Sequence, residues 1–208
     1  MTEATSRYHR LDLFVIWTIV FLLSEWLIAT LLGYWQAASP IVLALYARCI
    51  SATFALVYLV PRLSQRIRHR KWWAPFVVLF LYLGYLVGLQ YAGLEQPAFM
   101  EELMDVHPAL LALSIALLGA SLEEYWFRGY LFEVLEQKNL SQNQIIAFTA
   151  ILFSLLHAQY DWKIMLAILP IGLVLGALRS YYASVLPGLL LHIGHNTLTL
   201  IILLMDNN

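Results

Sequence analysis

Two adjacent carboxylates and an arginine interrupt a long apolar segment of this chain. Glu123 and Glu124 are followed by Arg128 inside the apolar run 108–137. Ionisable side chains within such segments are costly to bury, and they usually mark sites of substrate, ion or proton chemistry. Residues four apart on a helix are neighbours, so Glu124 and Arg128 can pair, whereas Glu123 points elsewhere without a cation in sequence reach. The spacing predicts a functional Glu123. It leaves open whether the pair is structural or chemical.

Polar residues at helical spacing recur in two later apolar runs. Phe153 precedes His157 by one turn, and His192 precedes Asn196 by one turn. At about 1.5 Å per residue, Glu123 and His157 each lie roughly 25 Å from the turn at 138–142. The two can therefore face each other across a hairpin, and we expect all these groups to share one layer.

Together these side chains have the chemistry of a water-activating hydrolase. A carboxylate can act as a general base toward water, and neutral imidazoles can hold that water or polarise a carbonyl. The amide of Asn196 adds a donor for a developing oxyanion. His195 lies three residues after His192 and next to Asn196, so helical geometry does not exclude it as a further candidate.

The elements that must position these groups are membrane helices. Hydrophobic residues make up 62% of the 208 residues and charged residues only 12%, which is outside the range of soluble domains. We expect an all-α polytopic bundle of about seven spans with a four-helix catalytic core. The N-cap of the fifth span is placed at Ser141, and the sixth span is expected to end at Arg179. The apolar runs lie at 11–33, 41–60, 73–92, 108–137, 143–158, 162–178 and 185–205.

Charge distribution predicts the orientation of the bundle. The basic cluster at 62–71 follows the second run, and the acidic connector at 95–105 follows the third. Cytoplasmic loops carry the excess of Lys and Arg, so the N-terminus is expected in the cytoplasm. Basic residues sit at span ends rather than along a stripe, so no nucleic acid partner is expected. The single Cys49 excludes an internal disulfide.

No internal repeat or linker divides the chain, yet its informative polar residues gather in the second half. We expect accessory transmembrane helices at 1–107 and a catalytic core at 108–208. Glu25 and Arg48 are two further ionisable residues, located in the first two apolar runs. Their expected role is a structural pair or part of a substrate path.

The three motifs resemble those of the CPBP intramembrane proteases, also called the CAAX protease and bacteriocin-processing or Abi family. The family pattern is Glu-Glu-x-x-x-Arg, then Phe-x-x-x-His, then His-x-x-x-Asn or Asp on successive helices. The matching residues here are Glu123, Glu124, Arg128, Phe153, His157, His192 and Asn196. Gly129 and Leu131 are similar to the family's continuation of the first motif. The resemblance covers about 108–203 and does not extend to the first three runs.

This resemblance implies an intramembrane endopeptidase in which Glu123 activates water. It also implies that His157, His192 and Asn196 complete the catalytic cluster, while Arg128 orients the two carboxylates through Glu124. No tightly bound cofactor is expected. Should a divalent metal such as zinc bind, its ligands would be Glu123, His157 and His192.

Two readings from other functional classes remain. A proton- or ion-coupled transporter could use the same Glu and His residues as a relay, although inverted repeats and glycine-broken paired helices are absent from the sequence. The other reading is a membrane immunity or interaction protein without catalysis. The expected substrate is a membrane-anchored protein or peptide, such as a CAAX-type tail, a leader or a sorting signal. The expected location is the lipid bilayer of a bacterial plasma membrane.

Overall fold

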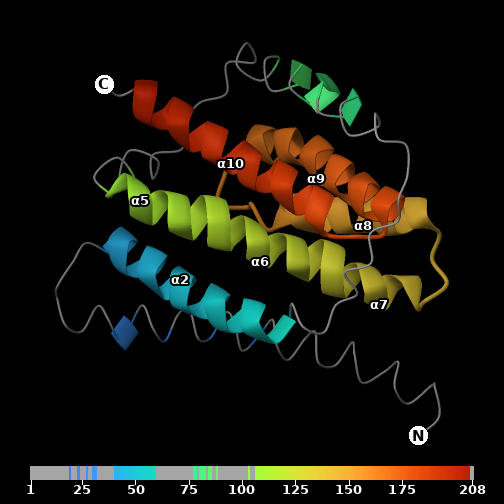
Figure 1. Ribbon diagram of the computed structural model, residues 1–208, viewed down its shortest axis with the longest axis horizontal. Coiled ribbons are helices and arrows are strands. Elements are labelled where there is room, and N and C mark those ends of the chain that lie inside the picture. The colour runs from blue at the N-terminus through green and yellow to red at the C-terminus, as the bar shows by residue number, and fades with distance from the viewer. Residues whose placement is uncertain are drawn as a thin grey trace, which may run out of the picture.

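The computed structural model describes residues 40–59 and 106–206 continuously, and it describes fourteen positions outside those two ranges. All regular elements in this part of the chain are helices, as Figure 1 shows, so the predicted all-α class is confirmed there. Runs 11–33 and 73–92 fall largely outside the described residues, and the predicted count of seven spans is not tested. The separate positions are 19, 23, 27, 30, 31, 77, 78, 80–82, 84, 85, 88 and 103.

Three of the described helices are long and apolar enough to cross a membrane. They cover Pro108–Glu136, Trp162–Tyr182 and Leu186–Met205. Large apolar side chains project from them into the surroundings, and an exposed apolar surface of this kind suits lipid rather than water. Examples are Leu113, Leu117, Leu166, Leu173, Leu190 and Ile201. These helices indicate an integral membrane protein.

The helix that carries the two glutamates is continuous from Pro108 to Glu136 but changes its winding along the way. Pro108 occupies the first turn, where its missing N–H costs nothing, and the His107 side chain accepts a hydrogen bond from the Ala109 N–H. The α-helical parts are α5 (Pro108–Leu111), α6 (Ala120–Glu124) and α7 (Phe132–Glu136), and the π-helical parts are η2 (Ala112–Gly119) and η3 (Tyr125–Leu131).

The π-helical parts were not predicted, and they flank the turn that holds the carboxylates. Where η2 ends, the Ala120 N–H donates to the Ile115 carbonyl, five residues earlier. Gly119 suits this winding, since a Cβ atom there would lie 2.9 Å from the Ser114 carbonyl oxygen. Such π-helical turns are frequent at functional sites. Helix α6 thus presents Glu123 and Glu124 between two widened stretches.

Helix α8 (Gln142–Leu155) begins where the sequence predicts and ends earlier. Ser141 forms a capping box, since its hydroxyl accepts from the Gln144 N–H and the Gln144 side chain accepts from the Ser141 N–H. The prediction that the fifth run continues to 158 is wrong. The backbone tightens after Leu155, with a His157 N–H to Ser154 carbonyl bond of 3.0 Å, which places His157 in a turn rather than within the helix.

Helix α9 (Trp162–Tyr182) runs past its predicted end. Arg179 does not terminate it; its Nε donates to the Arg128 carbonyl at 2.7 Å, so this arginine packs inward. The helix ends instead at Ala183, which adopts the left-handed conformation with φ 52°. Helix α10 (Leu186–Asp206) follows directly.

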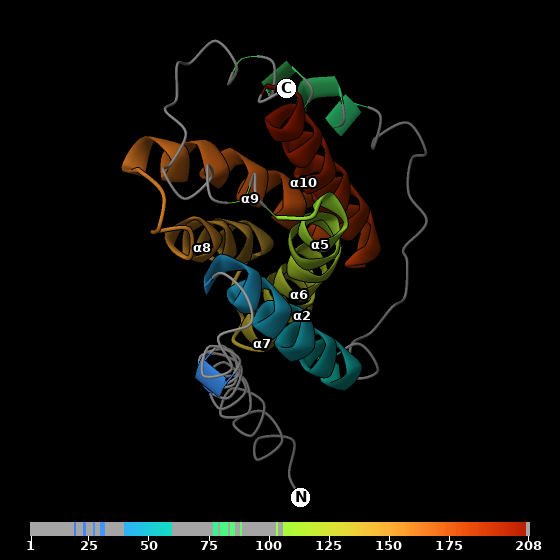
Figure 2. The ribbon, with the colours of Figure 1, turned by 90° about the vertical axis from the view of Figure 1, so that its left-hand side faces the viewer.

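Helices α8 and α9 pack closely against each other. Gly172 and Gly176 lie on one face of α9, and Cβ atoms there would come within 3.1 Å of Ala150 and 3.2 Å of Ile146. Small residues spaced four apart let two membrane helices approach closely. Seen end-on, α2 (Pro40–Leu59), α8, α9 and α10 lie around the helix 108–136 (Figure 2).

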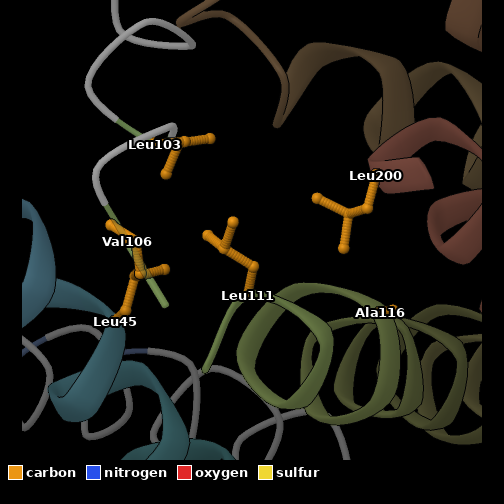
Figure 3. Close-up of a cluster of buried hydrophobic side chains, with 6 residues drawn as sticks. All are labelled: Leu45, Leu103, Val106, Leu111, Ala116 and Leu200. Carbon is orange, nitrogen blue, oxygen red and sulfur yellow. The ribbon is translucent and has the colours of Figure 1, made fainter. Parts of the chain in front are cut away.

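An apolar cluster joins α2, α5 and α10 near the start of the long helix. Leu111 is fully buried, and Figure 3 shows it between Val106 and Leu200. Further along α2, Ala52 packs against Leu122 of α6, one residue before Glu123. Helix α2 therefore follows the long helix in the same direction, from the apolar cluster toward the glutamates. The remaining members of the cluster are Leu45, Leu103 and Ala116.

Candidate active site

The ion pair predicted from the sequence is present and completely buried. Arg128 Nη1 donates to Glu124 Oε1 at 3.0 Å, and neither side chain has any exposed surface. Arg128 Nη2 donates to the Gly172 carbonyl of α9 at 3.0 Å, and the guanidinium carbon lies 4.5 Å from the centre of the Phe153 ring. The aromatic face adds cation–π attraction to the ion pair. A buried arginine is thus supplied with partners from three helices.

His192 joins the buried pair to the second carboxylate. Its Nδ1 lies 3.0 Å from Glu124 Oε1, and its Nε2 lies 3.7 Å from Glu123 Oε2. An ionised carboxylate only accepts hydrogen bonds, so His192 Nδ1 is the donor to Glu124, and Nε2 is the ring nitrogen that faces Glu123. Glu123 has no basic neighbour in sequence, and α10 supplies this one through space.

The two carboxylates differ sharply in solvent exposure. The Glu123 side chain is 30% exposed, whereas Glu124 is 0% and His192 only 4% exposed. A group that is to meet water must be accessible, and Glu123 alone of these three is. The two adjacent glutamates therefore have different surroundings, as expected for residues on different faces of a helix.

His157 lies beside the same cluster, held by its own helix end. Its Nδ1 lies 2.8 Å from the Phe153 carbonyl, which can only accept, so this nitrogen is the donor and Nε2 is left for the site. The Phe153 ring contacts both imidazoles, with centroid distances of 4.9 Å to His157 and 5.6 Å to His192. Phe153 thus lies beside His157, as its spacing predicts, and it also contacts His192.

Asn196 and His195, on the same helix as His192, contact other parts of the structure. Asn196 Nδ2 donates to the Ile115 carbonyl at 3.3 Å, at the π-helical stretch before α6. This bond uses one of the two hydrogens of the amide. The His195 ring packs edge-on against Tyr82 at 5.7 Å, and its buried Nδ1 has no partner among the described residues. His195 thus faces Tyr82, whereas His192 faces the glutamates.

Three residues that support the site were missed in the sequence. Gly172 supplies the carbonyl for Arg128, Arg179 binds the Arg128 carbonyl, and Gly188 of α10 leaves room for Glu124. A Cβ atom at position 188 would lie 3.1 Å from Glu124 Oε2. The available signals were a pair of glycines in apolar helices and an arginine inside an apolar run. Each had an equally ordinary explanation as packing or a span end.

Glu123, His157 and His192 are the ligands that the sequence suggests for a divalent metal. Within the described ranges, no group of three or more His, Cys, Asp or Glu side chains is arranged to hold a metal ion.

Replacing Gly188 with Ala should disturb the cluster through its closest contact. The added methyl group meets Glu124 Oε2, an atom on a rigid buried pair, so we expect a loss of about 1–3 kcal/mol in unfolding free energy. Gly194→Ala on the same helix is the matched control, because a Cβ there has nothing within 4 Å and should be neutral or slightly stabilising. Thermal unfolding in detergent compares the two variants. Equal effects would contradict the tight fit at Gly188.

The comparisons with known proteins identify the segment that builds this cluster. A family model described as type II CAAX prenyl endopeptidase Rce1-like matches residues 105–198, which include every motif residue from Glu123 to Asn196. No curated protein and no solved structure matches the chain. The family resemblance predicted from the three motifs is confirmed. Residues 105–198 are thus an Rce1-like domain, similar to the CAAX endopeptidases, which are proteases.

Proposed function

We propose that this protein is an intramembrane endopeptidase in which Glu123 activates the water that cleaves a peptide bond. The family supports proteolysis of a protein substrate, and the membrane-length helices support its location in a bilayer. The observation that carries the proposal is the contact of accessible Glu123 with His192, whose orientation is fixed by the buried Glu124. Glu123 and the Nε2 atoms of His192 and His157 are the chemically available groups of the cluster.

The first step is attack of water on the substrate carbonyl. Glu123 takes one proton from water as the water oxygen forms a bond to the carbonyl carbon. The accepting Nε2 of His192, 3.7 Å from Glu123, can hold the same water by its other hydrogen. Glu124 keeps the imidazole in this tautomer, as the buried carboxylate does in the serine protease triad.

The second step is collapse of the tetrahedral intermediate. The carbon–nitrogen bond breaks, and Glu123 returns its proton to the leaving nitrogen, which restores the carboxylate. The oxyanion needs a hydrogen-bond donor, and the second amide hydrogen of Asn196 is assigned to it. His157, with its Nδ1 bound to the Phe153 carbonyl, is assigned to the water side of the site.

The proposed substrate is the tail of a membrane-attached protein. The family description names CAAX prenyl endopeptidases, and a prenyl group would partition into the lipid that surrounds these helices. A segment anchored in this way reaches the carboxylates by lateral diffusion within the membrane. A leader or sorting peptide held in the bilayer would arrive by the same route.

Glu123→Gln should abolish cleavage while leaving the fold intact. The amide cannot accept a proton from water, so the rate should fall by at least about 1000-fold, in the range of general-base contributions. Glu136→Gln on the same helix is the control, since Glu136 lies outside the three motifs, bonds Gln142 and lies 4.0 Å from Arg179 Nη2 at a partly exposed position. Mass spectrometry of a prenylated peptide incubated with purified protein in lipid measures both. Full activity of the Glu123 variant would refute the mechanism, and transport without cleavage would favour a carrier.

Metal chelators should leave the activity unchanged. Every step is assigned to side chains, and the described residues offer no metal-ligand group. Cleavage should therefore continue at the same rate after dialysis against 1,10-phenanthroline. Activity that is lost on chelation and restored by added zinc would show that the carboxylate and imidazoles serve as ligands instead.

A further inference from the structure

Tyr160 contacts the candidate site and is not part of its three motifs. Its ring stacks on the His157 imidazole with a centroid distance of 5.9 Å and an interplanar angle of 23°. Phe153 contacts the same imidazole from another direction at 4.9 Å. The His157 ring is therefore fixed by one hydrogen bond at Nδ1 and by two aromatic neighbours.

The backbone around Tyr160 is well anchored for a connecting turn. The Tyr160 N–H donates to the His157 carbonyl at 3.0 Å, which sets the two rings at the same side of one turn. The next residue, Asp161, caps α9 by accepting from the Lys163 N–H at 2.8 Å. Tyr160 thus lies between the end of α8 and the capped start of α9. The backbone of this turn is already restricted, and stacking on His157 restricts the Tyr160 side chain as well.

The Tyr160 phenol lies within electrostatic reach of both Glu123 and Arg48. Burial raises the pKa of the Tyr160 phenol, the negative charge of Glu123 raises this pKa further, and the charge of Arg48 lowers it. Tyr160 is thereby linked to two groups of the site, to His157 by ring contact and to Glu123 by charge. Because the turn follows α8, a ring at this position can close the site beside both.

We propose that Tyr160 is a positioning residue that fixes the plane of the His157 imidazole by ring stacking. The His157 hydrogen bond at Nδ1 leaves rotation about that bond open, and a stacked ring removes this freedom. The imidazole Nε2 then keeps one direction toward the water site. This inference rests on the proposed peptidase function, in which His157 is assigned to the water side of the site.

Two substitutions of Tyr160 test whether stacking by the aromatic ring, rather than the hydroxyl group, is what the site requires. Tyr160→Phe keeps the stacking surface and should retain kcat within about threefold, whereas Tyr160→Leu removes it and should lower kcat by on the order of 10- to 100-fold with KM nearly unchanged. Tyr46→Leu is the matched control, because Tyr46 is half exposed on the surface of α2. If the Leu variant does not fold, Tyr160→Gln is interpreted in the same way.

Nitrogen NMR of the His157 imidazole provides a readout that does not depend on turnover. We expect one set of ring signals with a protonated Nδ1 in the wild type and in Tyr160→Phe, and shifted or exchange-broadened signals in Tyr160→Leu. Unchanged signals or unchanged kcat in the Leu variant would overturn the inference, as would an equal loss in the Phe variant. Absence of cleavage by the wild type would refute the peptidase function instead, and the NMR comparison would still decide the role of Tyr160.

Discussion

Burial of the Arg128 guanidinium is the constraint on which the rest of the site depends. A charge without exposed surface is tolerated only when its surroundings supply a counter-charge and hydrogen-bond acceptors. Glu124 supplies the first on the same helix, and the Gly172 carbonyl of α9 supplies the second. Arg179 of α9 in turn binds the backbone carbonyl of Arg128. Satisfying one arginine therefore fixes how α9 lies against the long helix.

The same pair also sets the chemistry of its neighbours. Glu124 Oε1 accepts from both Arg128 and His192, so α10 is positioned by a carboxylate that is already held. Gly188 allows this approach, because a larger residue would meet the other oxygen of Glu124. His192 can then turn its second nitrogen to Glu123. Two adjacent residues of one helix thus acquire different surroundings, one buried among donors and one accessible beside an imidazole.

What the sequence predicted well are relations within one helix. The pairing of Glu124 with Arg128 and the contact of Phe153 with His157 follow from spacing of four residues, and both are observed. The Ser141 cap also follows from a local pattern. These relations are local in the chain and are kept although Arg128 lies in a π-helical stretch and His157 in the turn after α8.

What the sequence could not predict depends on partners far along the chain. In the π-helical stretches a backbone N–H donates to the carbonyl five residues earlier instead of four. No residue pattern in the sequence predicts this change. The early end of α8 places His157 in a turn, where Tyr160 can stack on it. Asn196 bonds the Ile115 carbonyl, which helical spacing within α10 does not reveal. Gly172 and Gly188 have their roles only because helices pack on them.

The division of roles between the two carboxylates is tested most directly by the unfolding free energy of Glu124→Gln. Removing this charge leaves the Arg128 guanidinium buried without its counter-charge, so we predict a loss of about 3–5 kcal/mol. Glu123→Gln, measured alongside in the same detergent, should differ from the wild type by less than about 1 kcal/mol because that side chain is partly exposed. A Glu124→Gln protein as stable as the wild type would contradict the account.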